Sequence, residues 1–127
     1  MSYSAEEIKD KLGGRLIGRA GVKKLVCETL KLLPAESVDY LTANVWFISS
    51  FEDAWGFTMR GDELHGKHLI FLSDELFLET REHAVSTILH EVGHVILNHR
   101  NAILEPQESS ETEKQEKEAD AFARRYL

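Results

Sequence analysis

The amino-acid sequence predicts one α+β domain, with two helices, three short strands, a long helix, a loop and a closing helix in that order. Apolar residues recur at helical spacing near both ends of the chain, and the middle is rich in aromatic and β-branched residues. A chain of 127 residues without internal repeats fits a single hydrophobic core. We therefore treat residues 1–127 as one domain.

The composition is typical of a globular protein. Hydrophobic residues make up 43% of the chain and charged residues 29%. No apolar run is long enough to span a bilayer, and residues 1–11 lack the layout of a secretion signal. The single cysteine, Cys27, cannot form an internal disulfide, which favours a cytoplasmic location. We expect neither a membrane nor a nucleic acid as a direct partner, since the net charge is −7.

Most of this negative charge lies between Leu104 and Asp120, where seven acidic residues accompany two lysines. The more common interpretation of such a stretch is a solvated loop and helix face. The alternative is that some of these carboxylates bind a metal ion.

Two helices are predicted in the N-terminal third. Ser4-Ala5-Glu6-Glu7 has capping-box spacing and predicts a short helix that stops at Gly13-Gly14. A second helix is predicted from about Gly21 to Leu33, where Pro34 ends the apolar pattern. The apolar residues of this second helix are expected in the core: Val22, Leu25, Val26, Leu30 and Leu33.

Three strands are predicted at residues 44–49, 55–60 and 68–72, separated by segments that look like turns. Such short connections cannot hold the crossovers that parallel neighbours need, so we expect a mostly antiparallel meander. Trp46 and Trp55 are expected to make core or cross-strand contacts.

A long amphipathic helix is predicted from about Arg81 to Asn98, with Thr80 as its cap. Its buried stripe consists of Val85, Ile88, Leu89, Val92, Val95 and Ile96. Residues 101–112 are polar and predict a loop. The final helix, from about Glu113 to Leu127, has its apolar residues at helical spacing: Ala119, Phe122, Ala123 and Tyr126.

The segment His90-Glu91-Val92-Gly93-His94 lies inside the strongest predicted helix. Residues four apart lie on one face of a helix, so both imidazoles can reach one metal ion. Glu91 lies beside that face, where its carboxylate can act as a general base on metal-bound water. The alternative, two ordinary surface histidines, is less favoured because the motif falls within a well-patterned helix.

A catalytic zinc usually takes three protein ligands and leaves one position for water. Cys27 is a possible ligand but is better interpreted as a small buried hydrophobe on a distant helix. In the closing helix, Glu116 and Asp120 are four apart and share a face, whereas Glu118 points away. We expect Glu116 to reach the metal and Asp120 to accept the second ring hydrogen of a histidine.

Together the two helices resemble those of the ImmA/IrrE family of zinc peptidases. That family pairs an HExxH helix with a later helix carrying Glu-x-x-Ala-(Asn or Asp)-x-Phe-Ala, here Glu116 to Ala123. The Glu-x-x-Ala-Asp arrangement also resembles the membrane-associated Ste24/HtpX-type peptidases of the wider gluzincin group. Both resemblances imply that Glu116 is the third zinc ligand and Asp120 its outer partner. They also imply a minimal gluzincin-like zincin domain, with a small antiparallel sheet packed on the HExxH helix.

This resemblance covers about residues 80–127 and is weak before them. ImmA/IrrE proteins usually continue past Phe-Ala into further helices, whereas this chain stops at Leu127. The family would suggest a protein or peptide substrate, for example a repressor of the helix-turn-helix type.

The sequence thus predicts a zinc metallopeptidase that hydrolyses peptide bonds through a metal-activated water. His90, His94 and Glu116 would hold Zn²⁺, and Glu91 would accept the proton of the water and pass it to the leaving amine. An exposed strand edge at residues 68–72 would dock the substrate as an added strand. Manganese or iron could occupy the same ligands.

Two alternatives remain at this level. One is a regulatory zinc-binding protein that binds a protein partner and cleaves nothing. The other is a zinc-stabilised structural domain, although such sites usually have four protein ligands and more cysteine.

The remaining histidines carry weaker expectations. His83 precedes His90 by seven residues and projects from nearly the same side, but it is too far away to bind the same metal. His99 is expected at the surface. His65 and His68 flank a turn and a strand start, and their spacing supports no catalytic role.

Overall fold

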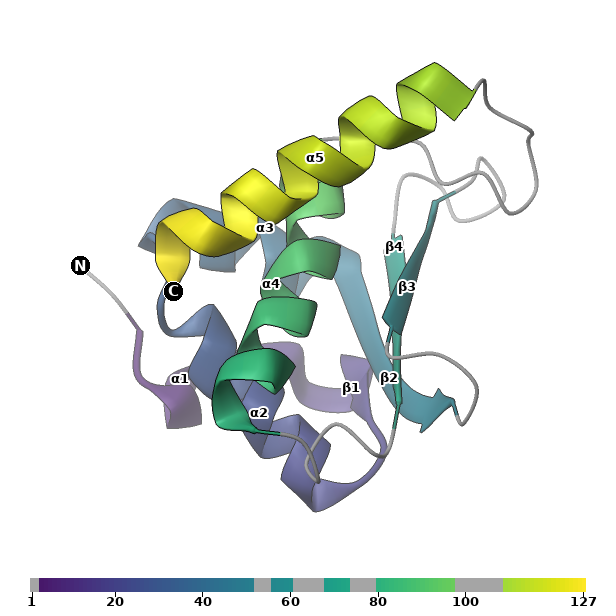
Figure 1. The fold of residues 1–127 in the computed structure, drawn as a ribbon. Coiled ribbons are helices and arrows are strands. Elements are labelled where there is room, and N and C mark those ends of the chain that lie inside the picture. Colours follow the sequence, from purple (N-terminus) through teal and green to yellow (C-terminus); the bar gives the residue numbers. More distant parts are fainter. Residues whose placement is uncertain (1–2, 52–55, 61–67, 74–79, 98–108) are drawn as a thin grey trace.

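The computed structural model describes residues 3–51, 56–60, 68–73, 80–97 and 109–127 of the chain. The helices lie on one side of a small sheet, and α5 crosses over α4 on the outside (Figure 1). This arrangement confirms the predicted α+β class. Among the described residues, no helix is both long enough and apolar enough to cross a membrane.

The first helix, α1 (Ala5–Leu12), begins and ends as predicted. The Glu7 backbone N–H donates to the Ser4 hydroxyl, and the Ser4 backbone N–H donates to the Glu7 carboxylate, so the capping box is complete. Gly13 ends the helix with a φ of 52°, a backbone conformation that glycine adopts at little cost. Local sequence signals therefore determine where this helix begins and ends.

The second helix, α2 (Ala20–Leu30), is confirmed but ends three residues earlier than predicted. Pro34 is the N-cap of a further helix, α3 (Ala35–Asn44). This helix was not predicted from the sequence. A proline costs little there, because the first helical turn has no internal acceptor for its missing N–H. α3 was missed because its core contribution is small, with Val38 and Leu41 as its buried apolar residues.

The four-stranded sheet has the order β1-β2-β4-β3. The three predicted strands are present as β2 (Val45–Phe51), β3 (Gly56–Arg60) and β4 (His68–Ser73), and β1 (Leu16–Ile17) is an addition. β4 lies between β2 and β3, pairing parallel with β2 and antiparallel with β3, and β1 pairs parallel with β2. The predicted antiparallel meander is therefore wrong.

The error concerns the order of the strands and not their directions. Three consecutive strands that alternate in direction can lie in the order 2-3-4 or in the order 2-4-3, and only the first order makes every neighbour antiparallel. The four residues between β2 and β3 allow five Cα–Cα steps, about 17 Å of reach, which exceeds the roughly 10 Å spanned by two strand spacings. Chain length therefore permits β4 to insert between them.

This order also corrects the predicted docking edge. β4 has a hydrogen-bonded neighbour on each side, so residues 68–72 cannot accept an added strand. Among the described strands, β3 and β1 are the outer ones.

The core lies between the sheet and the helices. Phe47 on β2 and Ile70 on β4 are fully buried, as are Ile88 and Leu89 on α4, and all belong to one apolar cluster. Trp46 is 39% exposed and lies in register with Leu69 of β4, so of the two predicted alternatives the structure excludes a core position and agrees with a cross-strand one. Trp55 lies outside the described residues.

The two C-terminal helices are confirmed. α4 (Arg81–Ile96) begins at Thr80, whose hydroxyl accepts from the His83 backbone N–H, and it buries the predicted stripe except for Ile96, which is half-buried. α5 (Ser109–Tyr126) begins four residues before the predicted start, so residues 109–112 are helical and not part of a loop. Residues 101–108 of the predicted loop lie outside the described residues.

Candidate metal centre

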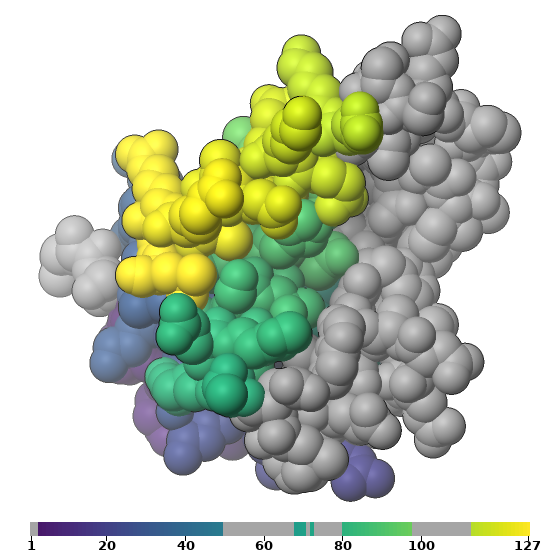
Figure 2. All heavy atoms as spheres, viewed as in Figure 1, coloured from purple at the N-terminus to yellow at the C-terminus, as the bar shows by residue number. Residues whose placement is uncertain are grey.

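α4 and α5 pack directly against each other (Figure 1). On α5 the contact is made by small and aromatic residues: Ala119 and Ala123 are buried, and Phe122 and Tyr126 are half-buried. In the space-filling view, α5 (yellow) and the N-terminal half of α4 (green) form adjoining parts of one surface (Figure 2). The amphipathic pattern of α5 thus turns one polar edge of that helix toward the histidines of α4.

His90, His94 and Glu116 come together where the helices cross. His90 Nε2 lies 2.8 Å from one Glu116 oxygen, Oε2, and His94 Nε2 lies 3.2 Å from the other, Oε1. The two Nε2 atoms are 3.2 Å apart. The three ligand atoms all lie within 4.8 Å of one another.

These distances suit a zinc ion. Zinc bonds of about 2.0–2.2 Å place neighbouring ligand atoms of a tetrahedron about 3.3–3.6 Å apart, which is about 0.1–0.8 Å more than the separations of 2.8–3.2 Å seen here. Two imidazoles and a carboxylate are also a ligand set that catalytic zinc sites use. The residues present therefore fit a zinc ion in both geometry and chemistry.

Asp120 approaches His90 from the other side of the ring. Its Oδ1 lies 2.7 Å from His90 Nδ1, while Nε2 of the same ring faces Glu116. The spacing of four residues on α5 places Glu116 and Asp120 one helical turn apart, so one helix contacts both nitrogens of one imidazole. With Nε2 as a ligand atom, Nδ1 carries the hydrogen and can donate it to Asp120.

Exposure differs among these residues. The side chains of His90 and His94 are 22% and 14% exposed, whereas those of Glu116 and Asp120 are 53% and 60% exposed. The two histidines of α4 are thus mostly covered, whereas the two carboxylates of α5 are more than half exposed.

Glu91 is 6% exposed and lies on α4 between the two histidines in sequence. Its role as general base stays a prediction. Glu118 is exposed on α5 and does not belong to the three-ligand group, as the helical spacing predicted.

Cys27 is buried in α2 as part of the apolar core. Desolvation raises the pKa of its thiol, which is the opposite of what a thiolate ligand needs. The interpretation of Cys27 as a small hydrophobe is confirmed.

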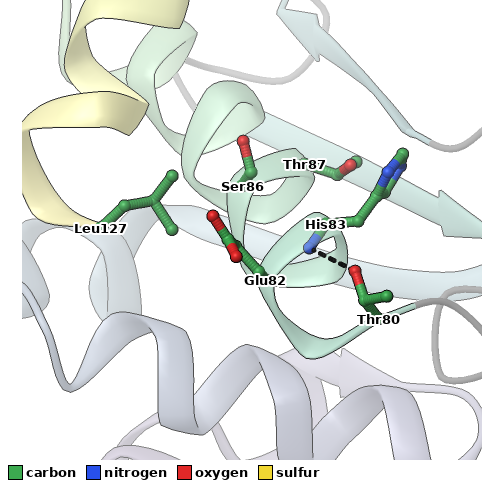
Figure 3. Close-up of a pocket in the computed structure, with 6 residues that line it drawn as sticks. All are labelled: Thr80, Glu82, His83, Ser86, Thr87 and Leu127. Carbon is green, nitrogen blue, oxygen red and sulfur yellow. Dashed lines mark hydrogen bonds between the residues drawn. The ribbon is translucent and has the colours of Figure 1, made fainter.

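His83 lies apart from the cluster. It lines a shallow hollow of about 340 Å³ together with residues at the start of α4 and with Leu127 (Figure 3). In this view His83 and Thr87 lie on one side of α4, while Glu82 and Ser86 lie on the side of Leu127.

His68 is buried at 2% exposure, with its Nε2 3.4 Å from the Tyr40 hydroxyl. The two rings pack edge to face, so His68 is part of the packing between α3 and the sheet. His65 and His99 lie outside the described residues.

One contact at this centre has no counterpart in the sequence analysis. Gly93, inside the HExxH segment, lies against Phe122 of α5. The only available sequence signal was a glycine inside a strong helix, which usually has a packing or functional reason.

The described C-terminal elements fall within a region that is similar to a known family. A family model described as Peptidase U49 matches residues 73–127, a stretch that includes α4 and α5. No curated protein and no solved structure matches the chain. The similarity over residues 73–127 suggests a peptidase, which would act on protein or peptide substrates.

Proposed function

We propose that this protein is a zinc-dependent metallopeptidase. The observation that carries the proposal is the convergence of His90, His94 and Glu116, from two helices, at spacings that suit one tetrahedral zinc ion. The similarity of the same region to a peptidase family supports hydrolysis of peptide bonds as the reaction. Kinship with ImmA/IrrE or other gluzincin peptidases belongs to this proposal and rests on the motifs of α4 and α5.

In the proposed mechanism His90, His94 and Glu116 hold the metal. When bound, zinc supplies Lewis acidity toward the scissile carbonyl and lowers the pKa of water. Glu91 accepts the proton of the attacking water and delivers it to the leaving amine. Asp120 holds the His90 ring in one tautomer and orientation through Nδ1.

Substrate binding is proposed at β3. This strand is an outer strand among those described, and it contacts α4, which carries the two histidines. An extended peptide can pair with the free backbone groups of such an edge. Among protein substrates, a helix-turn-helix repressor is a candidate that rests on the ImmA/IrrE resemblance alone.

The first experiment measures the zinc content of purified wild type, Glu116→Ala and Glu118→Ala. Wild type and Glu118→Ala are expected to bind about one zinc per chain, and Glu116→Ala is expected to lose it. Glu118 is a matched control, because it is an exposed glutamate on the same helix that lies outside the cluster. A wild type that takes up no zinc when supplied with it would refute the proposal.

The second experiment separates an enzyme from a zinc-binding regulatory protein. Glu91→Gln is expected to retain zinc and to lose cleavage of an unfolded protein such as denatured casein. If zinc-loaded wild type and Glu91→Gln behave alike on every protein substrate offered, the regulatory alternative replaces the enzyme.

A further inference from the structure

One close contact between α4 and α5 involves a glycine. Gly93 is buried, and a Cβ built on it would lie 3.1 Å from Phe122 Cδ1 and 3.2 Å from Phe122 Cβ and Cγ. Ordinary van der Waals contact begins at 3.4 Å, so a methyl group at position 93 would require Phe122 to give way by a few tenths of an ångström. The backbone of α4 therefore touches α5 directly at this point.

Rotation of the Phe122 ring would not make room for a side chain at position 93. Phe122 Cβ is itself one of the three nearest atoms, and its position is fixed by the backbone of α5. The ring also packs against Tyr126, with 5.1 Å between ring centroids. A residue larger than glycine at position 93 thus requires α5 to move away from α4 by about 0.2–0.3 Å or more, the deficit between 3.1–3.2 Å and 3.4 Å.

This contact lies within two turns of every proposed metal-binding residue. On α4, Gly93 is three residues after His90 and directly precedes His94, and on α5, Phe122 is six residues after Glu116. A helix moves as a rigid body over such short distances, so a displacement at Phe122 also displaces Glu116. The required shift is comparable to the range of about 0.2 Å within which metal–ligand distances of well-formed sites agree.

We propose that Gly93 and Phe122 are positioning residues, whose contact keeps α5 close enough to α4 for Glu116 to share one metal ion with His90 and His94. Neither residue touches the metal in this proposal, and both act through the placement of Glu116 against the two histidines. The proposal rests on the proposed zinc site. It adds a reason why the HExxH segment of this chain has glycine as its fourth residue.

The test is a competition titration of zinc against a chromophoric chelator, using the full chain of wild type, Gly93→Ala and Gly14→Ala. Gly14 is a matched control because a Cβ there meets nothing within 4 Å. We expect the zinc Kd of Gly93→Ala to rise about tenfold or more, the range seen when supporting residues of a metal site are changed. Gly14→Ala is expected to bind zinc as wild type does.

Thermal unfolding of the metal-free proteins distinguishes positioning from general packing. Alanine has a higher helix propensity than glycine, which offsets part of the packing penalty in Gly93→Ala. The loss of zinc affinity is therefore expected to exceed any loss of stability in the metal-free protein. The proposal is overturned if Gly93→Ala lowers the free energy of unfolding of the metal-free protein by as much as it weakens the free energy of zinc binding.

A double-mutant cycle with Phe122→Ala tests whether the two residues act through their contact. In the Phe122→Ala background two of the three crowding atoms are gone, so Gly93→Ala is expected to weaken zinc binding less than it does in wild type. Equal losses in both backgrounds would overturn the proposal. If Gly93→Ala alone does not fold, a double variant that folds and binds zinc supports the contact, and one that does not fold refutes it.

The outcomes also separate this inference from the proposed function. A wild type without zinc affinity refutes both. A wild type that binds zinc, together with a Gly93→Ala variant that binds it equally well, refutes only the positioning role.

Discussion

Replacement of Asp120 tests how the zinc ligand His90 is held. In Asp120→Ala the acceptor 2.7 Å from His90 Nδ1 is lost, while Glu116 and both histidines stay in place. Loss of such an outer partner typically weakens metal binding about 10- to 100-fold, or about 1.4–2.7 kcal/mol. Because the Asp120 side chain is 60% exposed, solvent screens its charge, and we expect the lower end of this range.

The effect can be measured by thermal unfolding followed by circular dichroism, with and without excess zinc. Zinc stabilises the folded state by an amount that depends on the ratio of its concentration to Kd, so a tenfold weaker site loses about 1.4 kcal/mol of that stabilisation. For a chain of this length about 1.4 kcal/mol corresponds to roughly 4–8 °C in Tm. The zinc-induced rise in Tm should therefore be smaller by this amount in Asp120→Ala and unchanged in Glu118→Ala.

The intermediate variant Asp120→Asn keeps an acceptor oxygen but loses the negative charge. We expect its zinc affinity to lie between those of wild type and Asp120→Ala, since a neutral acceptor orients the ring less strongly than a carboxylate. The reasoning is wrong if Asp120→Ala binds zinc as tightly as wild type, because His90 would then be held without its closest acceptor.

Three further predictions concern other parts of the fold. Ser4→Ala removes the cap of α1 and should lower the free energy of unfolding by about 1 kcal/mol, measured by urea denaturation. The pKa of Glu7 is lowered mainly by a hydrogen bond from the Ser4 backbone N–H. The pKa of Asp39 is lowered mainly by a hydrogen bond from the Tyr3 hydroxyl. Both carboxylates therefore stabilise the fold at pH values above the pKa they have in the unfolded chain. This stabilisation is lost as the pH falls through the lower pKa they have in the folded protein. Glu7→Gln should accordingly show a shallower loss of stability between neutral pH and pH 3 than wild type, and an unchanged slope would contradict this account. Finally, Cys27→Ala should keep its full zinc content, because the thiol lies in the apolar core, and any loss of zinc would make Cys27 a ligand.

Local signals account for what could be predicted of the fold. The capping residues Ser4 and Thr80 and the apolar stripe of α4 depend on residues within a few turns, and the helices they define are confirmed. The order of the strands depends on pairing between β2 and β4, which are far apart in sequence. Strand directions alone cannot decide between the two orders, so the sheet could not be derived from the sequence.

In the candidate site, too, local spacing predicts some features and tertiary packing decides the others. His90 and His94 are fixed on one face of α4 by their spacing. Glu116 could be selected over Glu118 because it shares a helix face with Asp120, but which face of α5 meets α4 is a tertiary property. Phe122 belongs to the apolar pattern of α5, but its contact with Gly93 joins two helices and cannot be inferred from the pattern of either one.

The openness of the centre favours catalysis over a structural role for zinc. A structural zinc is enclosed by four protein ligands, whereas the described residues here offer a group of three. Glu116 is also the most exposed side chain of the three, at 53%, and the proposed hydrolysis needs such exposure for water and a substrate carbonyl to approach a bound metal. If zinc served only to hold α5 on α4, the buried contacts of Ala119, Ala123 and Phe122 would already supply much of that attachment. A group of three ligands among the described residues is what the proposed function needs, because a catalytic zinc keeps one coordination position for water.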